Sequence, residues 1–415
     1  MKVLKFGGTS VGSPQRMKEV AKLIADGEQK IVVLSAMSGT TNTLVEISDY
    51  LYKKNPEGAN EIINKLESKY KQHVNELYST EEFKQKTLEF IKAQFNYIRS
   101  YTKDIFTLFE EKVILAQGEL ISTNMVTNYL QEQGVKAVLL PALEFMRTDK
   151  NAEPDPTYIK NKLAAQLELH PDADIYITQG FICRNAYGEI DNLQRGGSDY
   201  TAAIIAATLK ADCLEIWTDV DGFMTADPRV INNAYTIGHL SYVEATELCN
   251  FGAKVVYPPT IYPVFKANIP IKIKNTFNPE GEGTVIDDHS EDEGRLIKGI
   301  SSINDTSLLT VQGLGMVGVV GVNHRIFRAL ANAGISVFLV AQASSENSTS
   351  LGLRHADAEK ACEVLNKEFE KEISMGLMEN VRATGDLSTV AIVGENMRHN
   401  AGIIGKLFQT LGRNG

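Results

Sequence analysis

Two glycine pairs in this chain lie beside charged residues of the types that hold phosphate groups. The first is in KFGGTS, residues 5–10, where Gly7 and Gly8 follow Lys5 and a short apolar run. The second is in RGGSD, residues 195–199, between Arg195 and Asp199. Paired glycines let backbone N–H groups approach an anion closely, and the positive end of a following helix adds favourable charge. Phosphoryl transfer needs this mixture of cations, amides and an orienting carboxylate.

Each segment also has a purely structural interpretation. Two glycines between a strand and a helix can form only a turn, and an acidic residue at a helix start is often just a cap. The first segment also lacks the spacing of a P-loop, in which Gly-Lys and Ser or Thr follow four intervening residues. The spacing alone therefore indicates a nucleotide-handling protein and leaves its reaction open.

The flanking sequence predicts that both glycine pairs lie where a strand leads into a helix. A serine–proline pair at 13–14 is typical of a helix start, and apolar residues then recur at helical spacing. Apolar runs typical of buried parallel strands follow at residues 31–34, 136–140, 174–178 and 213–217. The alternation predicts an α/β fold, a mostly parallel sheet sandwiched by helices, with ligands at the carboxyl ends of its strands.

Composition narrows the class of protein. A chain of 415 residues is expected to form two or three domains, and its net charge of −10 argues against nucleic acid as a partner. No apolar run approaches the length of a membrane span, and the chain enters a strand at once without a signal peptide. The four cysteines lie far apart without metal or redox spacing, which is typical of a reducing compartment. We expect a cytoplasmic protein with no membrane partner.

The composition changes near residues 278–295, where prolines, glycines and an acidic run predict an exposed connector or hairpin and a domain boundary. An internal repeat lies beyond this boundary, and its two copies align with each other without a gap. Its six matched pairs are Gly313 and Gly394, Met316 and Met397, Gly321 and Gly402, Phe327 and Phe408, Leu330 and Leu411, and Gly334 and Gly415. The first copy continues into a predicted strand at 335–341, where the second copy stops. We therefore expect the chain to continue in its parent protein.

Three further segments complete a resemblance to a known family. They are WTDVDG at 217–222, ADPR at 226–229 and FGAK at 251–254. With the two glycine segments, they resemble aspartate kinase, of the amino-acid kinase fold family, from residue 1 to about 285. The repeat resembles the paired ACT regulatory units of the same enzymes. The resemblance implies a catalytic domain at 1–290 with a helical insertion at 57–111, an ACT-like α+β unit at 298–380 and a truncated second unit at 383–415.

Three features are most similar to the bifunctional aspartate kinase–homoserine dehydrogenases: the helical insertion, IKNT at 273–276 and QASSE at 342–346. In those proteins a dehydrogenase follows the second ACT unit. The resemblance implies ATP-dependent phosphorylation of the side-chain carboxylate of L-aspartate. The product, 4-phospho-L-aspartate, is the first intermediate toward threonine, methionine and lysine.

The matching positions imply roles on the acceptor side of the cleft. Lys5, Gly7 and Gly8 would hold the transferring phosphates, and Ser35 and Thr41 would line the aspartate side. The resemblance also implies that Glu119 pairs with the α-amino group of the substrate aspartate and Arg195 with its α-carboxylate. Ser198 and Asp199 would complete the site, with Asp199 orienting Lys5 or the metal-bound phosphates. From its sequence position alone, Glu119 could equally be a solvated acid at a helix start.

The nucleotide side would be formed by Thr218, Asp219, Met224, Arg229 and Lys254. Met224 stands where the family usually has a tyrosine, and Tyr257 stands where a histidine is common. Mg²⁺ would arrive with ATP and be held mainly by phosphate oxygens, so no protein metal ligand is predicted. No general base is required, because an aspartate carboxylate is already ionised near neutral pH.

The ACT-like units imply feedback inhibition by an amino acid. The resemblance to the bifunctional class favours threonine, with lysine as the alternative, and Gln342, Ser344 and Ser345 are the candidate effector residues. Those three could equally form a plain polar loop after a core strand. ACT units commonly pair, so a homodimer or higher homo-oligomer is expected, and a truncated second unit predicts a weakened threonine response.

Two rival functions remain open at this stage. One is another amino-acid kinase, acting on glutamate or acetylglutamate, although the segment 217–229 and the ACT-like tail argue against it. The other is a catalytically silent amino-acid sensor, although all the charged site candidates are present. Turnover of ATP with aspartate and with glutamate distinguishes the three.

Overall fold

The computed structural model describes residues 1–103, 105–193, 196–288, 296–395, 397 and 400–414. The chain divides into two compact units, each described here by itself. The first comprises Met1–Gly299 and Val393–Gly415, and the second comprises Ile300–Ile392. The residues of the predicted second ACT-like unit, 383–415, are thus divided between the two.

An eight-stranded sheet in the order β3-β4-β2-β1-β7-β9-β10-β8 forms the centre of the first unit. Its strands are β1 (Lys2–Phe6), β2 (Lys30–Leu34), β3 (Ala137–Leu140), β4 (Ile175–Gln179), β7 (Leu214–Thr218), β8 (His239–Ser241), β9 (Ile271–Asn275) and β10 (Thr284–Asp287). The pairs from β3 to β9 are parallel, and β10 is antiparallel to β9. The predicted mostly parallel sheet is confirmed. The hairpin expected after residue 278 lies between β9 and β10, and β10 belongs to the sheet.

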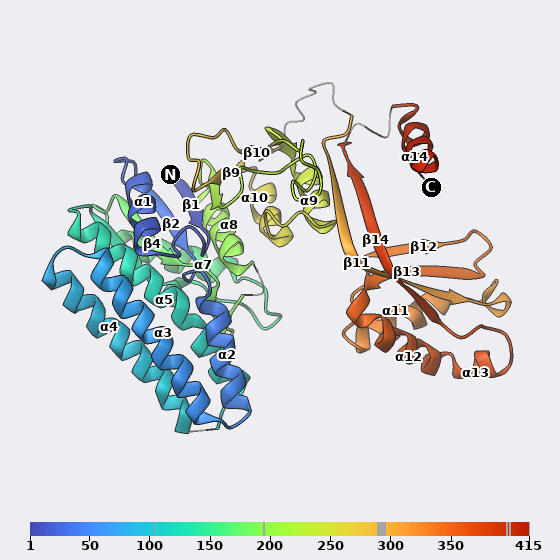
Figure 1. The fold of residues 1–415 in the computed structure, drawn as a ribbon, viewed down its shortest axis with the longest axis horizontal. Helices are drawn as coiled ribbons and strands as arrows, with labels where there is room; N and C mark the ends of the chain where they lie inside the picture. The colour runs from blue at the N-terminus through green and yellow to red at the C-terminus, as the bar shows by residue number, and fades with distance from the viewer. Residues whose placement is uncertain (104, 194–195, 289–295, 396, 398–399, 415) are drawn as a thin grey trace. The chain divides into compact units, whose positions relative to one another are not determined.

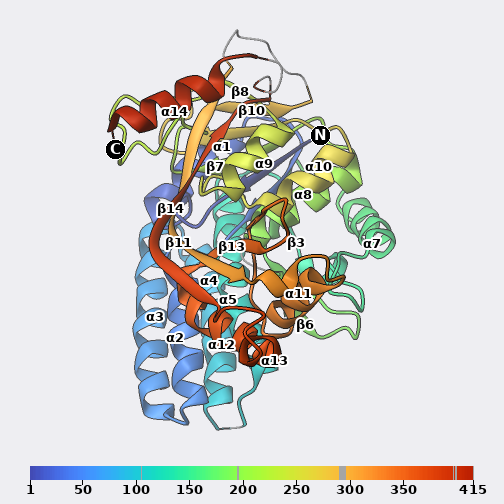
Figure 2. The same ribbon diagram turned by 90° about the vertical axis from the view of Figure 1, so that its right-hand side faces the viewer.

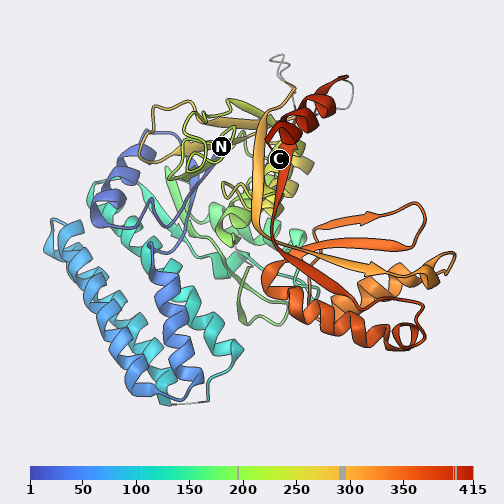
Figure 3. The same cartoon turned by 45° about the vertical axis from the view of Figure 1, so that its right-hand side comes forward.

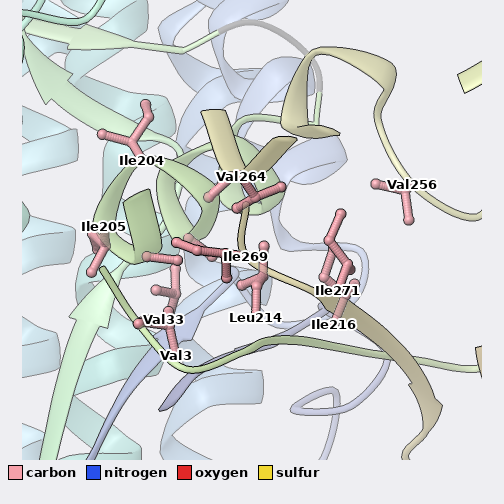
Figure 4. Packing of buried hydrophobic residues seen from close by; sticks show 14 of the residues in the cluster. Val3, Val33, Ile204, Ile205, Leu214, Ile216, Val256, Val264, Ile269 and Ile271 are labelled. Atoms are coloured by element: carbon pink, nitrogen blue, oxygen red, sulfur yellow. The ribbon is translucent and has the colours of Figure 1, made fainter. Parts of the chain in front are cut away.

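Helices cover both faces because the central strands are apolar on both sides. The helices of this unit are α1 (Pro14–Ile24), α2 (Thr40–Tyr52), α3 (Pro56–Leu77), α4 (Glu81–Ser100), α5 (Leu108–Glu132), α6 (Ala142–Phe145), α7 (Pro156–Glu168), α8 (Gly197–Leu209), α9 (Tyr242–Asn250), α10 (Ile261–Lys266) and α14 (Ile403–Asn414). On one face Val3 and Val33 pack with Ile205 of α8 and Val264 of α10 (Figure 4). The alternate residues of the same strands face α1, α2 and α5. Among the described residues no helix is long and apolar enough to cross a membrane.

The segment predicted as a helical insertion forms two long helices, α3 and α4. The side chain of Asn55 and the first-turn Pro56 begin α3, and the Thr107–Glu110 capping box begins α5. Figures 1 and 2 show α2, α3, α4 and α5 running side by side, and α3 packs against both α2 and α4. The insertion therefore joins the helical layer on one face of the sheet.

The second unit is an antiparallel sheet with helices on one face (Figure 3). Its strands, in the order β12-β13-β11-β14, are β12 (Leu339–Gln342), β13 (Ser348–Arg354), β11 (Gly299–Gln312) and β14 (Arg382–Val393), and its helices are α11 (Val322–Asn332), α12 (Ala358–Glu368) and α13 (Glu370–Ser374). The strand predicted at 335–341 begins only at Leu339. Ile335 is instead buried in the segment between α11 and β12. The apolar run 335–341 is therefore part connector and part strand.

Candidate active site

A cavity of about 460 Å³ opens at the carboxyl ends of β1 and β2. Its walls come from the end of β1 with the following turn, the loop 35–42 after β2, one residue of α5, Phe181 and the start of α8. The first turns of α2 and α8 both line it, and helix N-termini favour anions. Of the predicted site residues, the lining includes Lys5, Gly8, Ser35, Thr41, Glu119, Ser198 and Asp199.

The two glycine segments meet through an ion pair. Lys5 Nζ lies 2.6 Å from Asp199 Oδ1, and each side chain is 12% exposed. Lys5 reaches this position from β1, and Asp199 comes from the first turn of α8. The carboxylate therefore holds the ammonium group at the cavity wall, and Asp199 is more than a helix cap.

Close backbone approach explains one glycine in each segment. A Cβ at Gly8 would lie 2.7 Å from the carbonyl oxygen of Ala36, so only glycine lets the turn after β1 meet the loop after β2. The Ser38 N–H donates to the Gly8 carbonyl at 3.0 Å across the same junction. Gly196 has a φ of +80°, and a Cβ there would lie 2.3 Å from Cγ of Tyr257. Both glycines are therefore required by packing at the cavity wall.

Glu119 enters the cavity wall from the middle of α5 and is only 4% exposed. Its Oε1 accepts the Ala36 N–H at 3.1 Å, while Oε2 has no hydrogen-bond partner among the residues that the structure describes. Burial raises the pKa of Glu119 to about 8, against the smaller opposing effect of the Ala36 hydrogen bond. The alternative of a solvated acid at a helix start is therefore wrong. An unpaired buried carboxylate fits a cationic ligand group such as an ammonium.

Hydrogen bonds from α5 hold the loop after β2 in place. The Ser122 hydroxyl donates to the Ser35 carbonyl at 2.8 Å, and Ser122 is fully buried. Thr123 accepts from Gln179 at the end of β4, at 2.8 Å. These contacts fix Ser35 and Glu119 in one rigid arrangement.

The predicted nucleotide-side residues lie outside this cavity as its lining residues define it. Thr218 ends β7, and Asp219 and Lys254 are exposed. Met224 is half-buried and accepts the Thr236 hydroxyl at its sulfur. Arg229 is paired with Asp227 in a turn, with its side chain 84% exposed. This hydrogen-bonded guanidinium lowers the pKa of Asp227 to about 2.

Two hydrogen bonds connect the phosphate-type turn to that side of the sheet. The N–H of Gly7 donates to the Trp217 carbonyl on β7 at 3.2 Å. The hydroxyls of Ser10 and Thr276 lie 2.7 Å apart and are buried. The turn after β1 thus lies between the cavity and the ends of β7 and β9. Arg195, predicted to bind the α-carboxylate, lies outside the described residues.

Several cavity residues were not singled out in advance, notably Met37, Ser38, Asn42 and Phe181. Phe181 follows β4 with a φ of +68°, a left-handed conformation that is uncommon for a phenylalanine. The Phe181 N–H donates to Thr201 Oγ1 of α8 at 3.1 Å, which helps to hold this backbone. Its position just past a parallel strand was the available signal, because ligands gather at that edge.

The candidate effector residues lie in one loop of the second unit. Gln342 Oε1 accepts from Asn323 Nδ2 of α11 at 2.9 Å, and the Ser345 hydroxyl donates to Asn347 Oδ1 at 2.7 Å, while Ser344 is exposed. Asn323 Oδ1 is buried without a hydrogen-bond partner in the described part of the chain. The end of β12 is therefore tied to the start of α11.

Among the described residues no group of three or more His, Cys, Asp or Glu could hold a metal ion. Asp199 and Glu119 both line the cavity, and Asp199 is already paired with Lys5, so a Mg²⁺ ion at this site would be held mainly by nucleotide phosphates.

Comparison with known proteins assigns the family. Residues 1–275 match the amino acid kinase family, and residues 309–369 match an ACT domain. A bifunctional aspartokinase/homoserine dehydrogenase of Haemophilus influenzae is 36% identical over 99% of this chain and 52% of the relative. Lysine-sensitive aspartokinase 3 of Escherichia coli is 31% identical over 99% of this chain and 90% of the relative.

Solved structures agree with this assignment. The crystal structure of E. coli aspartokinase III in complex with aspartate and ADP (R-state) superposes with a TM-score of 0.83 at 29% identity, covering 99% of this chain and 91% of the other. The chain therefore belongs to the amino acid kinase family, and within it to the aspartokinases. It spans about half the length of the bifunctional relatives it matches.

Proposed function

We propose that this chain transfers the γ-phosphate of ATP to the side-chain carboxylate of L-aspartate, which gives 4-phospho-L-aspartate and ADP. The observation that carries the proposal is the buried Lys5–Asp199 ion pair beside Glu119 in one cavity. The aspartate and ADP complex of the E. coli relative supports the choice of substrates.

In this reaction an aspartate carboxylate oxygen forms a bond to the γ-phosphorus while the bond to the β,γ-bridging oxygen breaks. Both reactants are anions, so the site must neutralise their repulsion and align them. The Lys5 ammonium supplies positive charge there, and Asp199 fixes its direction. The backbone amide of Gly8 binds phosphate oxygens, while Gly7, whose N–H is bonded to the Trp217 carbonyl, gives the phosphates room to approach the turn. Mg²⁺ carried with ATP would add further neutralisation.

The acceptor is held by groups that match its charges. Glu119 pairs with the α-ammonium group through its unpartnered Oε2, and Arg195 pairs with the α-carboxylate. Ser35, Thr41 and Ser198 supply hydroxyl groups along the same wall. No residue needs to remove a proton, since the attacking carboxylate is already ionised.

The nucleotide binds on the side of Thr218, Asp219, Met224, Arg229 and Lys254 in this proposal. Support comes from the hydrogen bonds that join the turn after β1 to Trp217 and Thr276. Arg229 would exchange its pairing with Asp227 for a phosphate group. That exchange is feasible because the pair is exposed to solvent.

The test is an assay of ADP release by this chain with aspartate, glutamate, acetylglutamate or no acceptor. Aspartate-dependent release that glutamate does not support is the expected result. Release with glutamate or acetylglutamate alone would favour another amino-acid kinase. Tight aspartate binding without turnover, seen by calorimetry, would favour a sensor, and neither binding nor turnover would overturn the proposal.

Threonine is the proposed feedback effector, and lysine is the alternative suggested by the name of the E. coli relative. The proposed binding region is the loop of Gln342, Ser344 and Ser345, supported by the buried, unpartnered Asn323 Oδ1 beside it. Titrating each amino acid into the aspartate assay distinguishes them. A homodimer is part of this proposal, and sedimentation of the chain with and without each amino acid tests it.

A further inference from the structure

A buried hydrogen bond joins the helical insertion to the rim of the cavity. The hydroxyls of Tyr70 on α3 and Thr40 at the start of α2 lie 2.8 Å apart, and the two residues are 1% and 2% exposed. Thr40 directly precedes Thr41, which lines the cavity. The insertion thus contributes a polar group immediately behind the acceptor wall.

Thr40 also contacts α5 at the residue before Glu119. A Cβ at Gly118 would lie 3.3 Å from Cγ2 of Thr40 and 2.8 Å from Cβ of Ala36, so α5 approaches both closely. Ala36 in turn donates its N–H to Glu119. Thr40 is therefore packed between α3 and α5, and its methyl and hydroxyl groups each have a separate contact.

Packing in the helical layer holds the Tyr70 side chain in place. It is fully buried in the core of the helical layer, and its ring lies 5.9 Å from that of Phe95 on α4. Burial is the main effect that raises the pKa of Tyr70, and the charge of Glu119 raises it further. The phenol therefore stays protonated and lies within electrostatic range of Glu119.

We propose that Tyr70 is a positioning residue for the acceptor side of the cavity. Its hydroxyl fixes Thr40, and through Thr40 it fixes the turn that carries Gly39 and Thr41 against α5. The inference rests on the proposed function for the identity of the acceptor, and it gives the helical insertion a role in binding that acceptor.

The same layer offers a matched control. The Tyr78 hydroxyl, just after α3, donates to the Met125 carbonyl of α5 at 2.7 Å, and Tyr78 is 3% exposed. Neither Tyr78 nor Met125 is among the residues that line the cavity. Removing this hydroxyl deletes a comparable buried hydrogen bond between the insertion and α5, away from the acceptor wall.

The experiment compares Tyr70→Phe and Tyr78→Phe in the full chain by steady-state kinetics and thermal melting. We expect Tyr70→Phe to raise KM for aspartate about tenfold, the scale of one lost buried hydrogen bond, and to leave KM for ATP within about twofold. Tyr78→Phe should lower Tm by about as much as Tyr70→Phe does, but should leave KM for aspartate and KM for ATP unchanged. Thr40→Val should raise KM for aspartate as much as Tyr70→Phe does. The double variant Thr40→Val/Tyr70→Phe should have no higher KM than either single variant. Thr40→Ser keeps the hydroxyl group and should have the KM of the unaltered chain.

Hydrogen exchange of the backbone amides at 35–44 gives a readout that does not depend on the substrate. Tyr70→Phe should accelerate exchange there, whereas Tyr78→Phe should not. Equal KM and equal exchange in the two variants would overturn the positioning role. If the unaltered chain shows no aspartate-dependent ADP release, the proposed function fails, and the exchange comparison still decides the role of Tyr70.

Discussion

The proposed acceptor side and the proposed nucleotide side of the site differ in how many contacts the described residues make with one another. On the acceptor side Glu119 is buried, bonded to Ala36 and supported by Ser122. On the nucleotide side Asp219 and Lys254 are exposed, and Arg229 forms an exposed ion pair with Asp227. One side is preorganised for its ligand, and the other must rearrange exposed side chains. Substitutions on the acceptor side should therefore cost far more.

The largest effect is expected at the ion pair between the two sides. Lys5→Met should reduce kcat about 10³-fold, because it removes the positive charge that the proposed mechanism places beside the transferred phosphate. Asp199→Asn should cost less, since it leaves the lysine in place but loosely held. ADP release by each variant, with a melting curve to establish folding, measures the difference. Near-normal turnover by folded Lys5→Met would refute the assignment.

Replacing the buried carboxylate should mainly affect aspartate. Glu119→Gln keeps the size of the side chain and should raise KM for aspartate roughly 100-fold, because a buried ion pair loses its negative partner. KM for ATP should stay within about twofold. An equal rise in both KM values would show that the acceptor and nucleotide sides are not separate.

Glu119 also predicts a pH dependence of stability. Its pKa is raised from 4.5 to about 8, so between these values the folded chain binds more protons than the unfolded chain. The free energy of unfolding therefore falls as pH rises through that range, by at most about 1.4 kcal/mol per pH unit. Denaturant unfolding without substrate should show this slope in the unaltered chain, relative to Glu119→Gln. Parallel pH profiles would mean that the carboxyl is ionised throughout.

The smallest effect is expected on the nucleotide side. Arg229→Ala should raise KM for ATP only roughly two- to fivefold, because an exposed ion pair is worth less than about 1 kcal/mol. KM for aspartate and Tm should not change. A loss of activity comparable to that of Lys5→Met would show that Arg229 moves into a buried position during turnover.

The sequence predicted β1, β2, β3, β4 and β7 because these strands are largely apolar runs, but it missed β8, β9 and β10, which are short or alternate apolar with polar residues. It also singled out Lys5 and Asp199 as candidates, because their segments lie at strand–helix junctions, and the structure pairs the two side chains. The burial of Glu119 was not visible, because it depends on α5 crossing the loop after β2. The predicted start of β12 was wrong because Ile335 and Leu339 belong to one apolar run, in which Ile335 is buried after α11 and Leu339 begins the exposed strand.

Gly196 and Tyr257 illustrate a different kind of constraint. The tyrosine ring occupies the space that any side chain at position 196 would need. Divergence at one position is therefore limited by the residue at the other, although the two lie 61 positions apart in the chain. A larger residue at 196 would need both a smaller residue at 257 and tolerance of the left-handed backbone at φ +80°, so we expect glycine to persist at 196 among descendants of this chain.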